Sequence, residues 1–188
     1  MNFQTMLSFK PCIIWLTGYS GAGKSTIASA LEQKLLDQGL KPKILDGDTI
    51  RKSISRDLSF NQQDRAENMR RVSDLAYQDL QAGHIVLCAF ISPFRHNRRL
   101  VREKFKQGDF IEVFVDTPLA VCEHRDVKGL YQKARAGIIR DFTGIDSPYE
   151  KPLHPDIHLK NDTEYSADQS AEKIISYLLN RTFHQSSH

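Results

Sequence analysis

The chain contains few cysteines, and they are spaced too widely for a disulfide framework. Cys12, Cys88 and Cys122 are the only three among 188 residues, and no C-x-x-C occurs. An odd number of scattered cysteines excludes the class of small secreted domains that disulfides hold together. Because Cys12 and Cys88 lie in apolar runs, we expect buried free thiols in a reducing compartment.

A long apolar run is also missing. No stretch approaches the ~20 residues that a membrane-spanning helix needs. The N-terminal sequence MNFQTMLSFK has no basic region followed by a long apolar core, as a secretory signal would. These absences predict a cytosolic protein with no membrane segment.

Neither sign of charge is in large excess. The chain has 26 Lys and Arg against 23 Asp and Glu, a net charge of +3, so we expect no broad basic face for nucleic acid. Hydrophobic residues make up 40% and charged residues 26%, as in an ordinary globular protein. The length suits one domain over 1–188, and we expect flexible ends at 1–10 and 182–188.

The most specific motif present is GYSGAGKS at 18–25, which matches the pattern G-x-x-x-x-G-K-[ST] and follows the apolar run CIIWLT. Glycines let successive backbone N–H groups surround a phosphate, Lys24 reaches the outer phosphates, and Ser25 can ligate Mg²⁺. A chance glycine turn is the alternative, and the strand-like run before it argues against that. We predict that ATP binds to Gly18, Tyr19, Ser20, Gly21, Ala22, Gly23, Lys24, Ser25 and Thr26.

Short apolar runs alternate with helical patterns along the chain, which predicts an α/β fold with a parallel sheet of about five strands covered by helices on both faces. The predicted strands are 12–17, 43–46, 85–90, 110–116 and 157–160. The predicted helices run from the glycine loop to Gln38, from 62 to 82, from Pro93, from Pro118, and from 167 to 181.

The strand 85–90 ends in AFIS and lacks the acidic residue that many phosphate-loop proteins place there. We therefore expect Asp46 or Asp48, in the neighbouring run LDGD, to bind the metal and to act as the base. In a parallel sheet these carboxylates share one crevice with the glycine loop. Either could orient or deprotonate a substrate hydroxyl, while a tight turn with a helix cap explains Asp46 equally well.

Cations and isolated aromatics follow this crevice along the chain. Arg51, then Arg65 and Asn68 on one helix face, then Arg125 and Lys128 are candidate anion contacts. Lys133 and Arg135 are better explained as a solvated helix face.

Phe60 and Phe142 stand in polar surroundings, where each could stack on a nucleobase or make a minor hydrophobic contact. The irregular segment 137–155 is long for a connector and, with the residues from 125, is a candidate lid and substrate loop; a surface excursion without function is the alternative.

Taken in order, GYSGAGKST, LDGDTIR, DLSFNQQDRAENMRRV, AFISPFRHNR, RDVKGLYQKARAG and FTGIDSPYEKP resemble the adenylylsulfate kinase family over about residues 8–180. The resemblance implies a P-loop kinase fold and Mg²⁺-dependent transfer of phosphate from ATP to the 3′-hydroxyl of adenosine 5′-phosphosulfate in sulfate assimilation. A homodimer is an open option.

The resemblance also implies site residues. Lys24, Asp48 and Ser92 would be catalytic, with Asp48 facing the 3′-hydroxyl, Phe60 and Phe142 on either side of the adenine, and arginines on the phosphosulfate. The implied acceptor contacts are Asp48, Arg51, Phe60, Arg65, Asn68, Ile91, Ser92, Lys128 and Phe142.

Two positions need comment beside the resemblance. The family is described as carrying a phosphoserine where this chain has Ser92, whereas Ser92 before Pro93 also reads as a helix N-cap, and we favour direct transfer from ATP. The family usually shows DLGF where this chain has DLSF; if that glycine has a positive φ, Ser59 would strain the turn that aims Phe60.

Two other functions stay open from the sequence. One is a kinase of a different small hydroxylated acceptor on the same fold. The other is a nucleotide-binding switch without acceptor chemistry, against which the absence of an N-K-x-D guanine motif argues.

Overall fold

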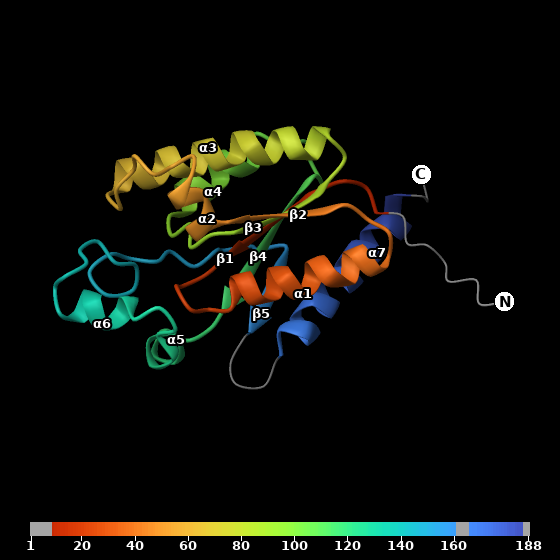
Figure 1. Cartoon of the computed structure of the whole chain (residues 1–188). Helices are drawn as coiled ribbons and strands as arrows, with labels where there is room; N and C mark the ends of the chain where they lie inside the picture. Colours follow the sequence, from red (N-terminus) through yellow and green to blue (C-terminus); the bar gives the residue numbers. More distant parts are fainter. Residues whose placement is uncertain (1–8, 161–165, 186–188) are drawn as a thin grey trace.

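The computed structural model describes residues 9–160 and 166–185. Five parallel strands form one sheet in the order β2-β3-β1-β4-β5, and helices cover both of its faces (Figure 1). The strands are β1 (Ile13–Thr17), β2 (Pro42–Asp46), β3 (Ile85–Ala89), β4 (Phe110–Asp116) and β5 (Ile157–Lys160). The predicted three-layer α/β fold is confirmed.

The helices divide between the two faces of the sheet. The helices α1 and α7 pack together on one face, and α2, α3 and α4 lie on the other, as Figure 1 shows. The helices are α1 (Lys24–Asp37), α2 (Gly47–Lys52), α3 (Gln62–Gln81), α4 (Arg95–Arg102), α5 (Leu119–Arg125), α6 (Leu130–Arg135) and α7 (Ala167–Gln185). Among the described residues, none of these helices combines the length and apolar character required to cross a bilayer.

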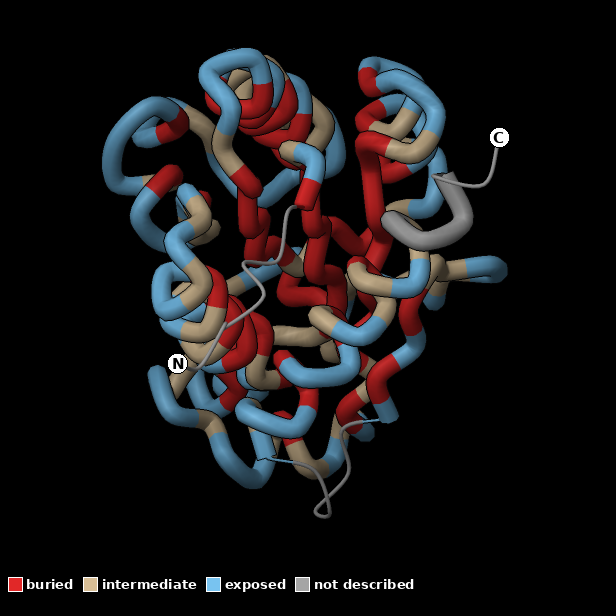
Figure 2. Tube along the Cα trace, turned by 90° about the vertical axis from the view of Figure 1, so that its right-hand side faces the viewer, coloured by how far each residue is buried: buried red, intermediate tan, exposed pale blue. Residues whose placement is uncertain are grey.

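The alternation of side chains along each strand divides the core into two layers. In β1, Ile13 and Trp15 point to the α3 side, while Ile14 and Leu16 point to the α1 side. All residues of β1 and β3 are buried, which is typical of strands covered on both faces (Figure 2). This buried centre supports the loops at the carboxyl edge of the sheet.

Two short helices and two helix ends differ from the prediction. The six-residue helices α2 and α6 were not predicted, because neither is long enough to show a helical period. The helix α4 begins at Arg95 instead of Pro93, and α7 continues to Gln185, past the predicted end at Arg181. Of the predicted flexible ends, 1–8 and 186–188 lie outside the described residues, whereas 182–185 belong to α7.

The strand order brings the loops of interest together. Because β3 lies between β2 and β1, the ends of these strands at Asp46, Ala89 and Thr17 are neighbours at one edge of the sheet. All strands are parallel, so the segments that follow them open onto the same crevice. The glycine loop therefore faces the segments that follow β2 and β3.

Candidate active site

The loop between β1 and α1 has a backbone that only glycine adopts easily. Gly21 and Gly23 have φ values of 73° and 99°. A Cβ placed on Gly18 would lie 2.6 Å from the carbonyl oxygen of Val115. The three glycines are therefore required by the shape of the loop.

Lys24 is the first residue of α1, and its side chain reaches back into this loop. Its Nζ donates to the carbonyl oxygens of Gly18 at 3.0 Å and Tyr19 at 2.6 Å, and the residue is buried. Burial lowers the pKa of Lys24 from its ordinary value of 10.5 to about 8. The ammonium group is thus held at the loop with its charge only partly compensated, as a site for phosphate requires.

Ser25 and Asp46 bring two oxygen donors together across the crevice. The Ser25 hydroxyl donates to Asp46 Oδ2 at 2.5 Å, and Asp46 Oδ1 accepts from the Asp48 N–H at 2.9 Å. The second bond caps α2, so Asp46 does act as the helix cap that the sequence allowed. A hydroxyl beside a carboxylate fits Mg²⁺, which binds through few protein oxygens when phosphates supply the rest. Within 9–160 and 166–185, no cluster of three or more His, Cys, Asp or Glu could hold a metal ion alone.

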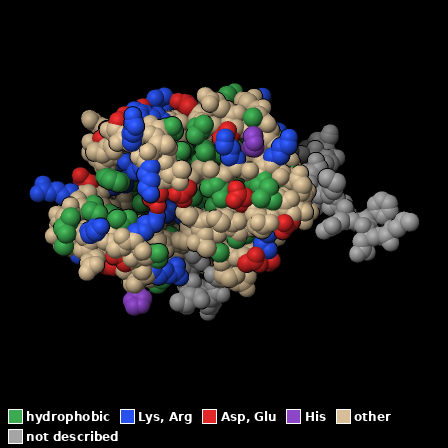
Figure 3. Space-filling view, in the orientation of Figure 1, with side chains coloured by type: hydrophobic (Ala, Val, Ile, Leu, Met, Phe, Trp, Pro, Cys, Tyr) green, Lys and Arg blue, Asp and Glu red, His purple; other side chains and the backbone are tan. Residues whose placement is uncertain are grey.

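A cavity of about 460 Å³ connects the glycine loop to the segments opposite it. Lys and Arg side chains gather over this region between α3 and α6 in Figure 3. From the predicted nucleotide loop, Ser20, Gly21, Gly23, Lys24, Ser25 and Thr26 line the cavity, while Gly18, Tyr19 and Ala22 do not. All the predicted acceptor residues line it: Asp48, Arg51, Phe60, Arg65, Asn68, Ile91, Ser92, Lys128 and Phe142.

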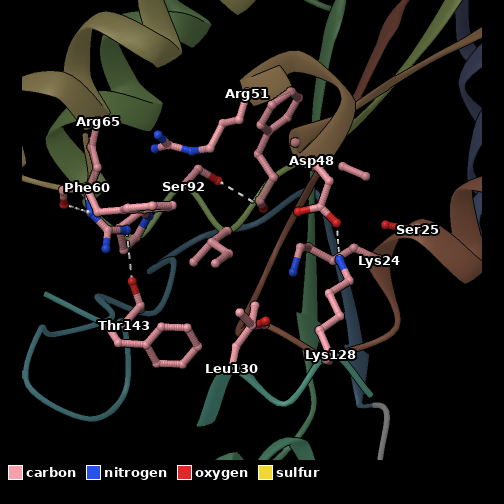
Figure 4. A pocket seen from close by; sticks show the side chains of 18 of the residues that line it. Lys24, Ser25, Asp48, Arg51, Phe60, Arg65, Ser92, Lys128, Leu130 and Thr143 are labelled. Carbon is pink, nitrogen blue, oxygen red and sulfur yellow. Dashed lines mark hydrogen bonds and ion pairs between the residues drawn. The ribbon is translucent and has the colours of Figure 1, made fainter. Parts of the chain in front are cut away.

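Asp48 and Lys128 form an ion pair across the cavity mouth. In Figure 4 they lie with Lys24 and Ser25 on one side, while Phe60, Arg65 and Thr143 lie on the other. Both side chains of the pair are more than half exposed, 57% for Asp48 and 54% for Lys128, so other partners can replace this contact. The pair joins the end of β2 to the segment before α6.

Two arginines surround the exposed ring of Phe60. The Arg51 guanidinium stacks 4.2 Å from the ring centroid, and its Nη1 donates to the Ser59 carbonyl at 3.0 Å. Arg65 donates from Nε to the Phe60 carbonyl at 2.6 Å and from Nη1 to Thr143 Oγ1 at 3.0 Å. Arg65 thereby ties the Phe60 segment to the segment that carries Phe142.

Phe142 and Asn68 form the buried part of this wall. The Phe142 ring packs edge-on against Tyr131 with centroids 5.0 Å apart, and only 8% of Phe142 is exposed. Asn68 Oδ1 is buried and has no hydrogen-bond partner in the described structure. An unpaired buried oxygen in a cavity wall is expected where a ligand supplies the missing donor.

Ser92 is buried and adopts a left-handed backbone with φ of 41°. Its hydroxyl accepts a hydrogen bond from Trp15 Nε1 at 3.2 Å, and the residue before α4 is Phe94. The prediction that Ser92 caps this helix is wrong, because its side chain points to Trp15 and the helix begins later, at Arg95.

Ser59 does not strain its turn. It is absent from the residues with positive φ, and its N–H and hydroxyl both donate to Asp64 Oδ2, at 2.8 Å and 2.5 Å. The condition under which Ser59 would misplace Phe60 is therefore not met.

Several cavity residues were missed from the sequence. Ile139, Arg140, Asp141 and Thr143 follow α6, Val127 and Leu130 lie just before and at its start, and Asn97 lies on α4. Position next to Phe142 was the one signal available for Asp141 and Thr143. Arg125, Lys133 and Arg135 do not line the cavity, and Arg135 pairs with Glu123, as expected of a solvated face.

Known proteins resemble this chain over most of its length. The family model described as "Adenylylsulphate kinase" matches residues 10–160. The "Adenylyl-sulfate kinase" of Vibrio vulnificus YJ016 is 59% identical over 90% of this chain and 80% of its own length. The "Bifunctional enzyme CysN/CysC" of Xylella fastidiosa Temecula1 is 55% identical over 89% of this chain, which spans 27% of that longer protein.

A solved structure supports the same relation. The Mycobacterium tuberculosis APS kinase CysC in complex with AMPPNP and APS superimposes with a TM-score of 0.86 at 47% identity, covering 91% of this chain and 99% of that one. Together with the cavity that joins a phosphate loop to an aromatic and cationic wall, these likenesses place the chain in the adenylylsulfate kinase family.

Proposed function

We propose that this chain transfers the γ-phosphate of ATP to the 3′-hydroxyl of adenosine 5′-phosphosulfate, as one cytosolic kinase domain whose residues 125–155 form a lid and substrate loop. The observation that carries the proposal is the single cavity shared by the phosphate loop and the wall that bears Phe60, Phe142 and Asn68. One cavity allows the two substrates to meet directly. The APS and AMPPNP named for the M. tuberculosis relative support the same pair of ligands.

The donor half consists of the loop 18–26. Its backbone N–H groups surround the phosphates, and the Lys24 ammonium neutralises charge on the transferred group. Ser25, together with the ATP phosphates, would hold Mg²⁺, which would supply further charge neutralisation when bound. We expect EDTA to abolish transfer and added Mg²⁺ to restore it in a coupled assay of ADP release.

The acceptor half positions the hydroxyl. Asp48 orients the 3′-hydroxyl and takes its proton as the new O–P bond forms and the bond to ADP breaks. Lys128 pairs with Asp48 in this structure. When Asp48 binds the 3′-hydroxyl instead, the Lys128 ammonium lies beside the charged phosphate that is being transferred. Phe60 and Phe142 hold the adenine, Arg51 and Arg65 face the phosphosulfate, and Asn68 Oδ1 accepts a donor from the ligand.

We propose direct transfer from ATP, without a covalent intermediate on Ser92. The Ser92 hydroxyl is buried and bound by Trp15, which favours a structural role for it. Phosphorylation of Ser92 would break the hydrogen bond from Trp15 and would place the phosphate in the wall of the cavity.

An acceptor panel tests the function. Rates of ADP release are compared for adenosine 5′-phosphosulfate, its 3′-deoxy analogue, gluconate, shikimate and AMP. We expect the highest kcat/KM for adenosine 5′-phosphosulfate and no ADP release with the 3′-deoxy analogue. A better substrate among the other acceptors would support the second candidate, a kinase of a different hydroxylated compound, and overturn the proposal.

A further inference from the structure

The turn at Ser92 is strained and lies in the cavity wall. A φ of 41° is rare for a residue that has a side chain. Such strain persists where the surroundings over-determine the conformation, and it is often found at functional sites. The contacts that hold this turn therefore affect the shape of the cavity on its acceptor side.

Three buried donors fix the turn from behind. The Ser92 carbonyl accepts from Arg98 Nη1 at 2.6 Å, and the Ser92 hydroxyl accepts from Trp15 Nε1 at 3.2 Å. The carbonyl of Ile91, the preceding residue, accepts from Thr17 Oγ1 at 2.8 Å. Both carbonyls of the turn are thus directed into the protein.

Arg98 joins this turn to two other parts of the molecule. Its Nε donates to Glu112 Oε1 on β4 at 2.8 Å, and its Nη2 donates to the Glu150 carbonyl at 2.7 Å. Only 3% of Arg98 is exposed, so the guanidinium carries a desolvation cost that these hydrogen bonds offset. One side chain therefore connects the turn to the central sheet and to the end of the segment 137–155, and it fixes their relative positions.

The backbone N–H groups of the turn remain available. Neither the N–H of Ile91 nor that of Ser92 donates to an acceptor within the residues that the structure describes, and both residues line the cavity. Successive N–H groups next to a left-handed residue form an anion-binding concavity. An anionic group of the acceptor is the chemical class that such donors bind.

We propose that Arg98 is a positioning residue for the acceptor: through the Ser92 carbonyl it holds the strained turn whose two free N–H groups bind the anionic part of the acceptor. This inference rests on the proposed function for the identity of the acceptor. Trp15 assists by fixing the Ser92 hydroxyl.

The test compares Arg98→Met with Arg102→Met. Arg102 lies one turn further along α4 and approaches the same Glu112, at 3.6 Å, but has no contact with Ser92. We expect Arg98→Met to raise the KM for adenosine 5′-phosphosulfate about ten- to hundredfold, the range for a lost hydrogen bond to a charged group. The KM for ATP should change less than about twofold, and Arg102→Met should leave both KM values within about twofold.

Equal changes in both KM values, or the same acceptor effect in Arg102→Met, would overturn the inference and make Arg98 a stability residue only. If Arg98→Met does not fold, Trp15→Phe removes the donor to Ser92 and keeps an aromatic ring in the buried stack with Phe90 and Phe110, although the smaller ring fills this part of the core less completely. We expect the acceptor KM to rise about two- to fivefold, and an unchanged KM would contradict the inference. A wild-type chain that transfers no phosphate would instead overturn the proposed function.

Discussion

Among single residues, Asp48 carries the largest share of the proposed chemistry. It lies at the start of α2, beside the phosphate loop, and its carboxylate pairs with Lys128 from the opposite segment. A carboxylate in this position can accept a proton only if the acceptor hydroxyl displaces or shares the contact with Lys128. The exposure of both side chains allows such an exchange.

We predict that Asp48→Asn lowers kcat about 100- to 10,000-fold, the range for loss of a general base, while the KM for ATP changes little. Steady-state kinetics with each substrate varied measure both parameters. Asp57→Asn is a matched control, because Asp57 is an exposed carboxylate that pairs with Arg71 outside the cavity. Unchanged turnover in Asp48→Asn would remove Asp48 as the base.

The two phenylalanines of the acceptor wall should respond differently. Phe60→Ala removes a ring that is 51% exposed, so we expect normal stability and a rise of roughly five- to hundredfold in the acceptor KM, since stacking of a base contributes about 1–3 kcal/mol. Tyr77→Ala, which removes a similarly exposed ring outside the cavity, should leave KM unchanged.

Phe142→Ala should raise the acceptor KM and also destabilise the fold. Its ring is buried against Tyr131, and removal of a buried phenylalanine costs about 3–5 kcal/mol. Urea unfolding measures the second effect. An equal rise in the KM for ATP would place this ring at the donor side.

At the scale of elements, the sequence predicted the five strands of the described residues and the long helices, because a buried strand, an amphipathic helix and a terminating glycine each leave a local pattern. The helices α2 and α6 were not predicted, because a helix of six residues is too short to show a helical period. The start of α4 was misplaced because the Ser92 hydroxyl is used by Trp15, a contact 77 positions away. The ion pair between Asp48 and Lys128, and the anchoring of Arg65 on Thr143, likewise depend on tertiary structure that no local pattern contains.

The segment 137–155 contacts the phosphate loop at Gly144 and at Tyr149, whose ring lies 4.8 Å from that of Tyr19. Gly144 has a φ of 95°, and a Cβ there would lie 2.8 Å from Leu119 Cδ1 and 3.0 Å from Tyr19 Cε1. Gly137 has a similar φ of 72° but no atom within 4 Å of such a Cβ. Substitutions at these two glycines therefore distinguish the cost of a left-handed backbone from the cost of steric crowding.

We therefore predict that Gly137→Ala costs about 1–2 kcal/mol of unfolding free energy, through its left-handed backbone alone. Gly144→Ala should cost about 1–3 kcal/mol more and should raise the KM for ATP, because Tyr19 belongs to the phosphate loop. Denaturant titrations and kinetics of both variants measure this. Equal stability and equal KM in the two variants would show that the segment is not coupled to the loop through Gly144.

For the whole molecule, the buried charge of Lys24 links the phosphate site to global stability. Burial lowers its pKa from 10.5 to about 8, so the unfolded chain binds more protons than the folded one between these pH values. The contribution of Lys24 to stability therefore rises with pH across this window, and the destabilising effect of its charge is complete below about pH 8. At about 1.4 kcal/mol for each tenfold change in proton affinity, the effect is on the order of 3 kcal/mol.

Lys24→Met removes this titration. We predict that the difference in unfolding free energy, wild type minus variant, becomes more positive from pH 8 to pH 10.5 by up to about 3 kcal/mol. Urea unfolding at several pH values measures it, and subtraction of the variant cancels the other titrating groups. A difference that does not vary with pH would mean that Lys24 keeps its ordinary pKa in the folded chain.

The account as a whole claims that one cavity brings a phosphate donor and a sulfonucleotide acceptor together for direct transfer. The most direct test is to incubate the protein with ATP, Mg²⁺ and adenosine 5′-phosphosulfate and to identify the products by ³¹P NMR and mass spectrometry. We predict ADP and a nucleotide that carries a new phosphate on its 3′-oxygen. Release of inorganic phosphate alone, or an acceptor recovered unchanged under conditions where a control kinase acts, would contradict the account.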